Sequence, residues 1–173
     1  VISENDMSRQ SLNVTLSPSM DIMVSSNFER LLFDAHGRDG ESIKDLMARF
    51  NQGDVSLNDE AWSFVKTNFD SYKVDDSRTC EVIKQVFDDT QYLLDPHTAI
   101  GLDAARNCWK DKSVPMITLA TAHPVKFPEA VEKAGCESPK LPEHMVDLFE
   151  REEAYEVLEN SLDDVQAFVT KNI

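Results

Sequence analysis

Hydrophobic residues recur at helical spacing through the first ninety positions, and this pattern predicts a series of short amphipathic helices. Each set places its apolar side chains at i, i+3, i+4 or i+7, which aligns them on one helix face. The sets are Phe28, Leu31 and Leu32; Ile43, Leu46, Met47 and Phe50; Trp62, Val65 and Phe69; and Val82, Ile83, Val86 and Phe87.

Start and stop signals divide these helices. Ser26-Asn27-Phe28-Glu29 has the form of a capping box, in which Ser26 is the N-cap and accepts from the Glu29 amide. Asn58 is the expected N-cap of a later helix. Gly37 and Gly53 are expected at the C-terminal ends of the helices that precede them. Residues 40–91 are therefore predicted to be a helical insert whose charges are solvated.

The second half begins with a strong helix start at Asp95-Pro96, an N-cap carboxylate followed by proline at the first helical position. The helix is expected to run to about Trp109, with small residues that permit close approach of another backbone. The apolar run 114–119 then predicts one buried strand. A helix at 128–133, ended by Gly135, completes this region.

The tail is predicted to hold a helix around 145–149, a short strand at 154–158, and a last helix with Ser161 as N-cap and Asp164 three residues later. Helices alternating with strands indicate an α/β fold that is predominantly helical with a few strands.

Composition limits the possible function classes. A length of 173 residues fits one domain, and no apolar stretch reaches the roughly 20 residues of a membrane span. The net charge of −15 repels phosphate backbones, so nucleic acid is not an expected partner. Three cysteines without metal-ligand spacing favour a reduced, cytoplasmic protein. The start at Val1 shows no secretory signal, and we expect a piece cut from a longer chain.

The candidate chemistry lies after the predicted strand. Thr121 and His123 follow its carboxyl end, where ligands bind in open α/β sheets. A threonine there is also a common turn residue, and a histidine beside proline is often only a hydrogen-bonding group. His97 stands at a helix start, which favours a neutral imidazole. Lys126 could form a Schiff base, but other lysines share its neighbourhood.

Other site types are not supported by the sequence. His36 and His144 have no partner at ligand spacing, so no metal site is expected. The five glycines form neither GxGxxG nor GxxxxGK, so the chain lacks a glycine-rich phosphate loop.

Three stretches together resemble consecutive blocks of the C-terminal half of threonine synthase, in the bacterial and fungal branch of that family. They are TLSPSMDIMVSSNFERLLF at 15–33, DPHTAIGLDAAR at 95–106 and LATAHPVKFPEAV at 119–131. The blocks occur in the family's order, and the resemblance extends over nearly the whole chain. It implies the C-terminal portion of a pyridoxal-phosphate enzyme of the tryptophan-synthase-like fold.

The resemblance implies a function for the longer enzyme and roles for a few residues. The enzyme converts O-phospho-L-homoserine and water to L-threonine and phosphate. Its Schiff-base lysine and phosphate loop belong to the N-terminal half, so no catalytic residue is expected in this chain. Thr121 is expected to hydrogen-bond the pyridine nitrogen of pyridoxal phosphate, while His123 shapes the loop. Asn27 is a candidate on the substrate side, or a first-turn residue satisfied by backbone.

The resemblance also divides the chain. Residues 15–36 and 95–135 are expected to be cofactor-domain blocks, 40–91 the helical insert and 141–173 a C-terminal tail, all within a single fragment whose partner is the N-terminal half. The isolated fragment is expected to be inactive. Two alternatives are a free-standing acidic helical interaction domain and a hydrolase using His123, although the latter lacks a GxSxG elbow.

Overall fold

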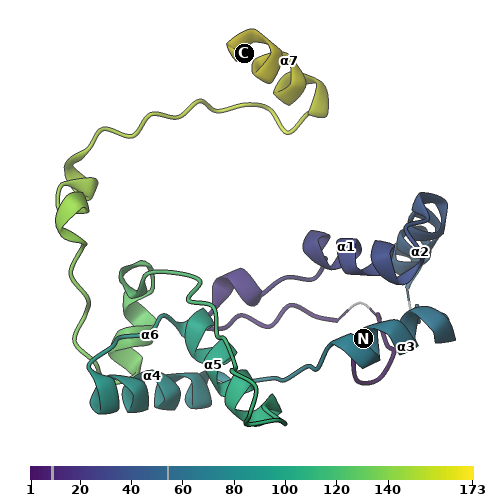
Figure 1. Ribbon diagram of the computed structural model, residues 1–173. Helices are drawn as coiled ribbons and strands as arrows, with labels where there is room; N and C mark the ends of the chain where they lie inside the picture. The colour runs from purple at the N-terminus through teal and green to yellow at the C-terminus, as the bar shows by residue number, and fades with distance from the viewer. Residues whose placement is uncertain (9, 54) are drawn as a thin grey trace. The chain divides into compact units, whose positions relative to one another are not determined.

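The computed structural model describes residues 1–8, 10–53 and 55–173. They divide into two units, Val1–Lys140 and Leu141–Ile173 (Figure 1). The first unit contains η1 (Pro18–Met20), α1 (Ser26–Ala35), α2 (Gly40–Gln52), α3 (Asp59–Asn68), α4 (Asp76–Thr90), α5 (Pro96–Cys108), η2 (Pro124–Lys126) and α6 (Pro128–Lys133). The second contains η3 (Glu143–Met145), η4 (Leu148–Glu150) and α7 (Leu162–Asn172).

One hydrophobic cluster of the first unit lies where α1 packs against α2 and α3. Leu32, Leu46 and Val65 contribute side chains that are at most 1% exposed. The N-terminal segment closes this cluster, because the Asn5 side chain donates to the Leu57 carbonyl at 3.0 Å and accepts from the Leu57 amide at 2.8 Å. The apolar spacing of the first ninety residues therefore predicted real helix faces. Phe69 is an exception, because it follows α3 as its C-cap and is 45% exposed.

A second cluster forms where α4 packs against α5 and α6. Val82, Ile83 and Val131 are fully buried there. Arg78 on α4 also reaches across to Asp103 on α5, with an Nη2 to Oδ1 distance of 2.8 Å, and Asp103 is only 1% exposed. This cluster holds α5 in place, and α5 carries the residues of the site described below.

Most of the predicted helix ends are confirmed. Asn58 accepts from the Ala61 amide, Asp95 from the amides of His97 and Thr98, and Ser161 from the Asp164 amide. Gly37, Gly53 and Gly135 all have positive φ after α1, α2 and α6. The capping box at Ser26 is wrong. Ser26 is already the first residue of α1 and Ser25 is its N-cap, so the non-helical backbone that an N-cap requires lies one residue earlier.

The predicted strands are wrong for the described residues, none of which forms a strand. In 114–119, Ile117 is 80% exposed and Leu119 is 74% exposed. A strand is stabilised by hydrogen bonds to a neighbouring strand, and the described part of the chain supplies no neighbour. The segment instead runs beside α5, where a Cβ added at Gly101 would lie 3.6 Å from the Thr118 methyl group.

The tail also differs from its prediction. Residues 154–158 are extended but unpaired, and the side chains of Tyr155 and Val157 are about four-fifths exposed. The expected helix around 145–149 is divided into the two short 3₁₀ helices η3 and η4. The predominantly helical character is thus confirmed, while the few strands are absent from the described residues.

The assignment of residues 15–36 and 95–135 to a cofactor domain and 40–91 to an insert stays a prediction. Within the described ranges, no helix has both the length and the apolar character to cross a membrane.

Candidate functional site

Asp95, the N-cap of α5, is a buried carboxylate with donors on both oxygens. It is 1% exposed. Oδ1 accepts from the His97 amide and from the His97 ring Nδ1, both at 2.9 Å. Oδ2 accepts from the Thr98 hydroxyl. The carboxylate therefore caps the helix and also orients the two side chains that follow it.

His97 connects α5 to the segment that contains η1. Its Nε2 accepts from the Ser19 backbone amide at 3.2 Å. Because a backbone N–H only donates, Nε2 carries no proton, and Nδ1 must be the protonated nitrogen that donates to Asp95. The two bonds correspond to the Nδ1–H tautomer of the imidazole. It also packs on Phe127, with ring centroids 4.5 Å apart.

Thr98 connects α5 to the loop after 114–119. The Thr98 hydroxyl gives its proton to Asp95 and accepts from the Thr121 backbone amide at 3.0 Å. The hydroxyl oxygens of Thr98 and Thr121 are 3.4 Å apart, which is long for an O–H···O hydrogen bond. The backbone of Thr121 is thus held firmly, while its own hydroxyl proton remains available to another acceptor.

These contacts surround a pocket of about 490 Å³. Ser19 and Met20 line it from one segment, His97 and Gly101 from α5, and Ile117, Leu119, Thr121, Lys126 and Phe127 from the 115–127 region. Among these described lining residues, Lys126 is the one with a formal charge at neutral pH. The pocket therefore combines apolar and aromatic walls with the hydroxyls of Ser19, Thr118 and Thr121, an imidazole and one ammonium group, as small-molecule sites usually do.

The predicted site residues are not all brought together. Thr121 lies in the pocket. His123 is exposed, and its Nδ1 accepts from the Val125 amide at 3.2 Å, so it caps η2. Asn27 is exposed on the first turn of α1 and is not among the residues that line the pocket. Lys126 lines the pocket with its Nζ 5.9 Å from the Phe127 ring centroid.

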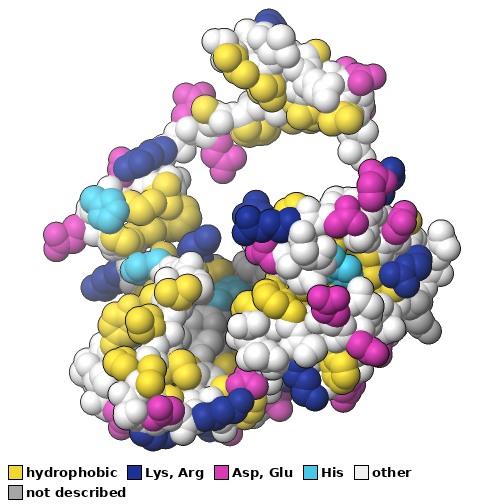
Figure 2. Space-filling view, turned by 45° about the vertical axis from the view of Figure 1, so that its right-hand side comes forward, with side chains coloured by type: hydrophobic (Ala, Val, Ile, Leu, Met, Phe, Trp, Pro, Cys, Tyr) yellow, Lys and Arg dark blue, Asp and Glu magenta, His cyan; other side chains and the backbone are white. Residues whose placement is uncertain are grey.

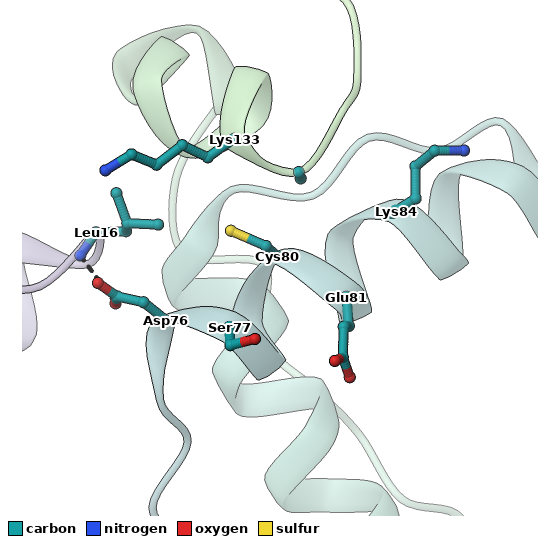
Figure 3. Close-up of a pocket in the computed structure, with 8 residues that line it drawn as sticks. Leu16, Asp76, Ser77, Cys80, Glu81, Lys84 and Lys133 are labelled. Carbon is teal, nitrogen blue, oxygen red and sulfur yellow. Dashed lines mark hydrogen bonds between the residues drawn. The ribbon is translucent and has the colours of Figure 1, made fainter.

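A second pocket, of about 510 Å³, lies between α4 and α6 and is a weaker candidate (Figure 3). The Cys80 sulfur points into it, whereas Glu81 and Lys84 point away. Burial raises the pKa of the Cys80 thiol, which keeps it protonated and unreactive. The Lys133 ammonium is engaged with Glu129 at 2.8 Å. No nucleophile and base are paired among these described residues.

The three segments that meet at the first pocket, through Ser19, His97 with Thr98, and Thr121, are those that carry the resemblance. Residues 98–169 match the family model described as threonine synthase, C-terminal. The threonine synthase of Pseudomonas aeruginosa is 56% identical over 173 residues, covering 99% of this chain and 37% of that protein. The chain belongs to the threonine synthase family. The resemblance inferred from the sequence is confirmed.

Solved threonine synthases have the same fold over this region. A crystal structure described as a pyridoxal-phosphate-bound threonine synthase from Brucella melitensis superposes with a TM-score of 0.82 and 40% identity, covering 98% of this chain and 37% of that one. The yeast threonine synthase gives a TM-score of 0.78 at 28% identity over 98% of this chain. The chain spans less than two-fifths of the length of these threonine synthases.

Sequence reasoning missed part of this candidate site. Asp95 was predicted only as a helix cap, and Ser19, Thr98 and Phe127 were given no role in it. The available signal was the pair His97-Thr98 directly after a buried N-cap, because two polar side chains in a buried first turn need partners. Those partners, Ser19 and Thr121, are 78 and 23 residues away in sequence.

Proposed function

We propose that this chain is the C-terminal portion of a threonine synthase and forms one wall of its pyridoxal phosphate site. The longer enzyme would convert O-phospho-L-homoserine and water to L-threonine and phosphate. The observation that carries the proposal is the meeting of all three family-like segments at the pocket containing Thr121. The pyridoxal phosphate bound by the Brucella melitensis threonine synthase adds support.

The pocket residues fit the ring of this cofactor. The Thr121 hydroxyl has an available proton and lies at the pocket, so it can donate to a pyridine nitrogen. His97 and Phe127 supply an aromatic wall against which a flat ring can pack. The phosphate group and the covalent bond to the cofactor need residues outside this chain, because its five glycines form no phosphate loop.

When bound, the cofactor ring supplies an electron sink for bond cleavage next to the amino group of the substrate. Thr121 influences this property through the nitrogen it contacts. A hydroxyl is too weak an acid or base to stabilise a fixed positive charge there, whereas a carboxylate would do so. A neutral ring is the weaker electron sink, which suits elimination and replacement more than transamination.

The exposed 114–119 segment supplies a surface for the N-terminal half that we propose as its partner. Val114, Ile117 and Leu119 are 56%, 80% and 74% exposed. Apolar side chains also lie open on the visible surface in Figure 2. Val114 pairs its amide with Asp111 and its carbonyl with the Trp109 indole, whereas residues 116–119 make no backbone hydrogen bond within the described chain. An apolar run of this kind is suited to strand addition, so these residues would become a sheet strand once the N-terminal half provides a neighbour.

A chimera tests the function. The 173 residues would replace the matching region of the Pseudomonas aeruginosa threonine synthase, to which they are 56% identical. We expect the purified chimera to bind pyridoxal phosphate and to release phosphate from O-phospho-L-homoserine with formation of threonine. The 173 residues alone should do neither, because they lack the lysine and the phosphate anchor.

Variants of Thr121 separate a cofactor contact from a turn residue. Thr121→Ser keeps the hydroxyl and should retain most activity in the chimera. Thr121→Asp should trap a proton on the ring nitrogen and lower kcat at least tenfold, while the cofactor stays attached. A folded chimera that binds no pyridoxal phosphate would contradict the proposal, as would equal activity for Thr121→Asp and the parent chimera.

We also propose that the enzyme acts in the cytoplasm. All three cysteines, Cys80, Cys108 and Cys136, are free thiols, which suits a reducing compartment.

A further inference from the structure

We propose that Asp95 is a positioning residue that holds two parts of the pocket wall through separate arms, one through His97 and one through Thr98. Its importance for the cofactor rests on the function proposed above, whereas the positioning itself does not. The proposal starts from the burial of the group: Asp95 is 1% exposed, His97 8% and Thr98 6%. Buried polar groups of this kind are costly unless each finds a partner.

The first arm fixes the wall formed by η1. Asp95 Oδ1 receives the Nδ1 proton of His97, so Nε2 is left as an acceptor for the Ser19 amide at 3.2 Å. A protonated or flipped imidazole could not accept this bond. The segment before η1 is held independently, because Asp21 accepts from both the amide and the hydroxyl of Thr15 at 2.8 and 2.7 Å. Among the described residues, the His97 bond is the hydrogen bond that joins the first turn of α5 to η1.

The second arm fixes the wall formed by Thr121. Asp95 Oδ2 takes the Thr98 hydroxyl proton, so the Thr98 oxygen can act only as an acceptor. It accepts the Thr121 amide at 3.0 Å. The backbone of Thr121 is therefore fixed without using its hydroxyl, whose oxygen remains 3.4 Å away from that of Thr98. The arm thus positions the group that is expected to meet the ligand and leaves its proton free.

The two arms need a group with two acceptor oxygens. A carboxylate has them, whereas an asparagine would present one oxygen and one amide. An asparagine amide facing Thr98 would donate to the Thr98 oxygen and compete with the Thr121 amide. Asp95 is therefore not equivalent to other good N-caps at this position.

Amide hydrogen exchange by NMR on the 173-residue chain tests the arms separately. The variants are Thr98→Val, which removes the hydroxyl but keeps the side-chain shape, and His97→Phe, which removes Nε2 but keeps a ring against Phe127. Thr98→Ser is the conservative rescue. Thr79→Val is the matched control, because Thr79 is also buried, on α4, and its hydroxyl donates to the Asp75 carbonyl at 2.8 Å, away from the pocket.

Each arm should affect its own amide. All exchange rates are normalised to that of the amide of Val131, a fully buried residue. Thr98→Val should raise the normalised rate at Thr121 roughly three- to tenfold, which is the effect of losing one ordinary hydrogen bond. The normalised rate at Ser19 should stay within twofold of the parent value. His97→Phe should do the reverse. Asp95→Asn keeps one acceptor oxygen for His97 and presents its amide to Thr98, so it should speed exchange at Thr121 more than at Ser19. Thr98→Ser and Thr79→Val should leave both amides within twofold.

The proposal is overturned if the ratio of the Thr121 exchange rate to the Val131 exchange rate is no higher in Thr98→Val than in Thr79→Val. It is also overturned if His97→Phe and Thr98→Val speed both amides equally, because the arms would then not be separate. Normalising to Val131 keeps the test decisive even when a variant lowers the stability of the whole unit.

A second measurement distinguishes this inference from the proposed function. In the chimera, fluorescence titration with pyridoxal phosphate should show weaker binding for Thr98→Val, by roughly three- to tenfold, and near-parental binding for Thr98→Ser. The expected exchange effects together with unchanged cofactor binding would keep the positioning role and reject the cofactor site. Loss of cofactor binding without the exchange effects would reject the arms.

Discussion

The exposure of Ile117 gives a quantitative test of the fold, in comparison with Ile83. Both are isoleucines, but Ile83 lies on α4 and is fully buried in the second hydrophobic cluster, whereas Ile117 is 80% exposed. Truncation to alanine removes the same atoms in each case. The difference between the two variants therefore reports burial rather than residue type.

The expected magnitudes differ by several-fold. Ile83→Ala loses the transfer free energy and leaves a cavity, which together cost about 2–5 kcal/mol. Complete burial of an isoleucine side chain contributes about 1.5–3 kcal/mol, and Ile117 buries only about a fifth of its surface, so Ile117→Ala should cost roughly 0.3–0.6 kcal/mol or less. With a urea m-value of about 2 kcal/mol/M, the unfolding midpoint should fall by about 1–2.5 M for Ile83→Ala and by less than about 0.3 M for Ile117→Ala.

Urea unfolding followed by tryptophan fluorescence and circular dichroism measures both changes. Trp62 packs against the first hydrophobic cluster. Trp109 reports on the start of the exposed segment, because its indole N–H donates to the carbonyls of Asp111 and Val114 at 2.8 and 2.9 Å. Urea unfolding curves recorded at two protein concentrations, tenfold apart, control for self-association through residues 114–119.

A cost above about 1.5 kcal/mol for Ile117→Ala, independent of concentration, would refute the reasoning. It would mean that Ile117 is buried within the isolated chain and that 114–119 needs no partner. In the chimera, by contrast, the cost of Ile117→Ala should rise toward that of Ile83→Ala, since the segment would then be covered.

Two further outcomes are expected. When the 173-residue chain is mixed with pyridoxal phosphate and treated with borohydride, mass spectrometry should find Lys126 unmodified, because the chain provides no phosphate anchor. Stoichiometric attachment of the reduced cofactor to Lys126 would instead make Lys126 a catalytic residue. Asp39 is the N-cap of α2, and hydrogen bonds from the Ser42 hydroxyl and then the Glu41 amide lower its pKa. The Asp39 carboxylate should therefore stabilise the folded chain at pH values above its unfolded pKa of about 3.9. This stabilisation should be lost as the pH falls through the lower pKa of the folded state. The difference in urea midpoint between Asp39→Ala and the parent chain should therefore be constant near neutral pH and shrink toward pH 3; a difference that grows on acidification would contradict this sign.

The success of the sequence predictions follows the distance over which each signal acts. The caps at Asn58, Asp95 and Ser161 depend on amides two or three residues away, and all three are present. Glycine helix ends depend on one backbone conformation and were also correct. Even the error at Ser26 is a displacement by one residue between two adjacent serines.

The strands failed because their stability is not local. The apolar run 114–119 has the composition of a buried strand, but pairing and burial come from other segments. The same reason explains why the sequence predicted Thr121 as a site residue but not its partners in the pocket. Its position after the run was readable, whereas its contact with Thr98 depends on how α5 lies against a loop 23 residues later.

Asp95 shows how a local signal can conceal a longer-range one. Serine, asparagine and aspartate are nearly interchangeable as N-caps, so a cap explains the residue type without further demands. The structure adds demands that only aspartate satisfies, because both oxygens also receive side-chain protons, from His97 and Thr98. Those two side chains then accept from the amides of Ser19 and Thr121, which both line the pocket. The choice of cap is therefore constrained by the pocket more than by the helix, and a helix-stability argument alone would underestimate the effect of Asp95→Asn.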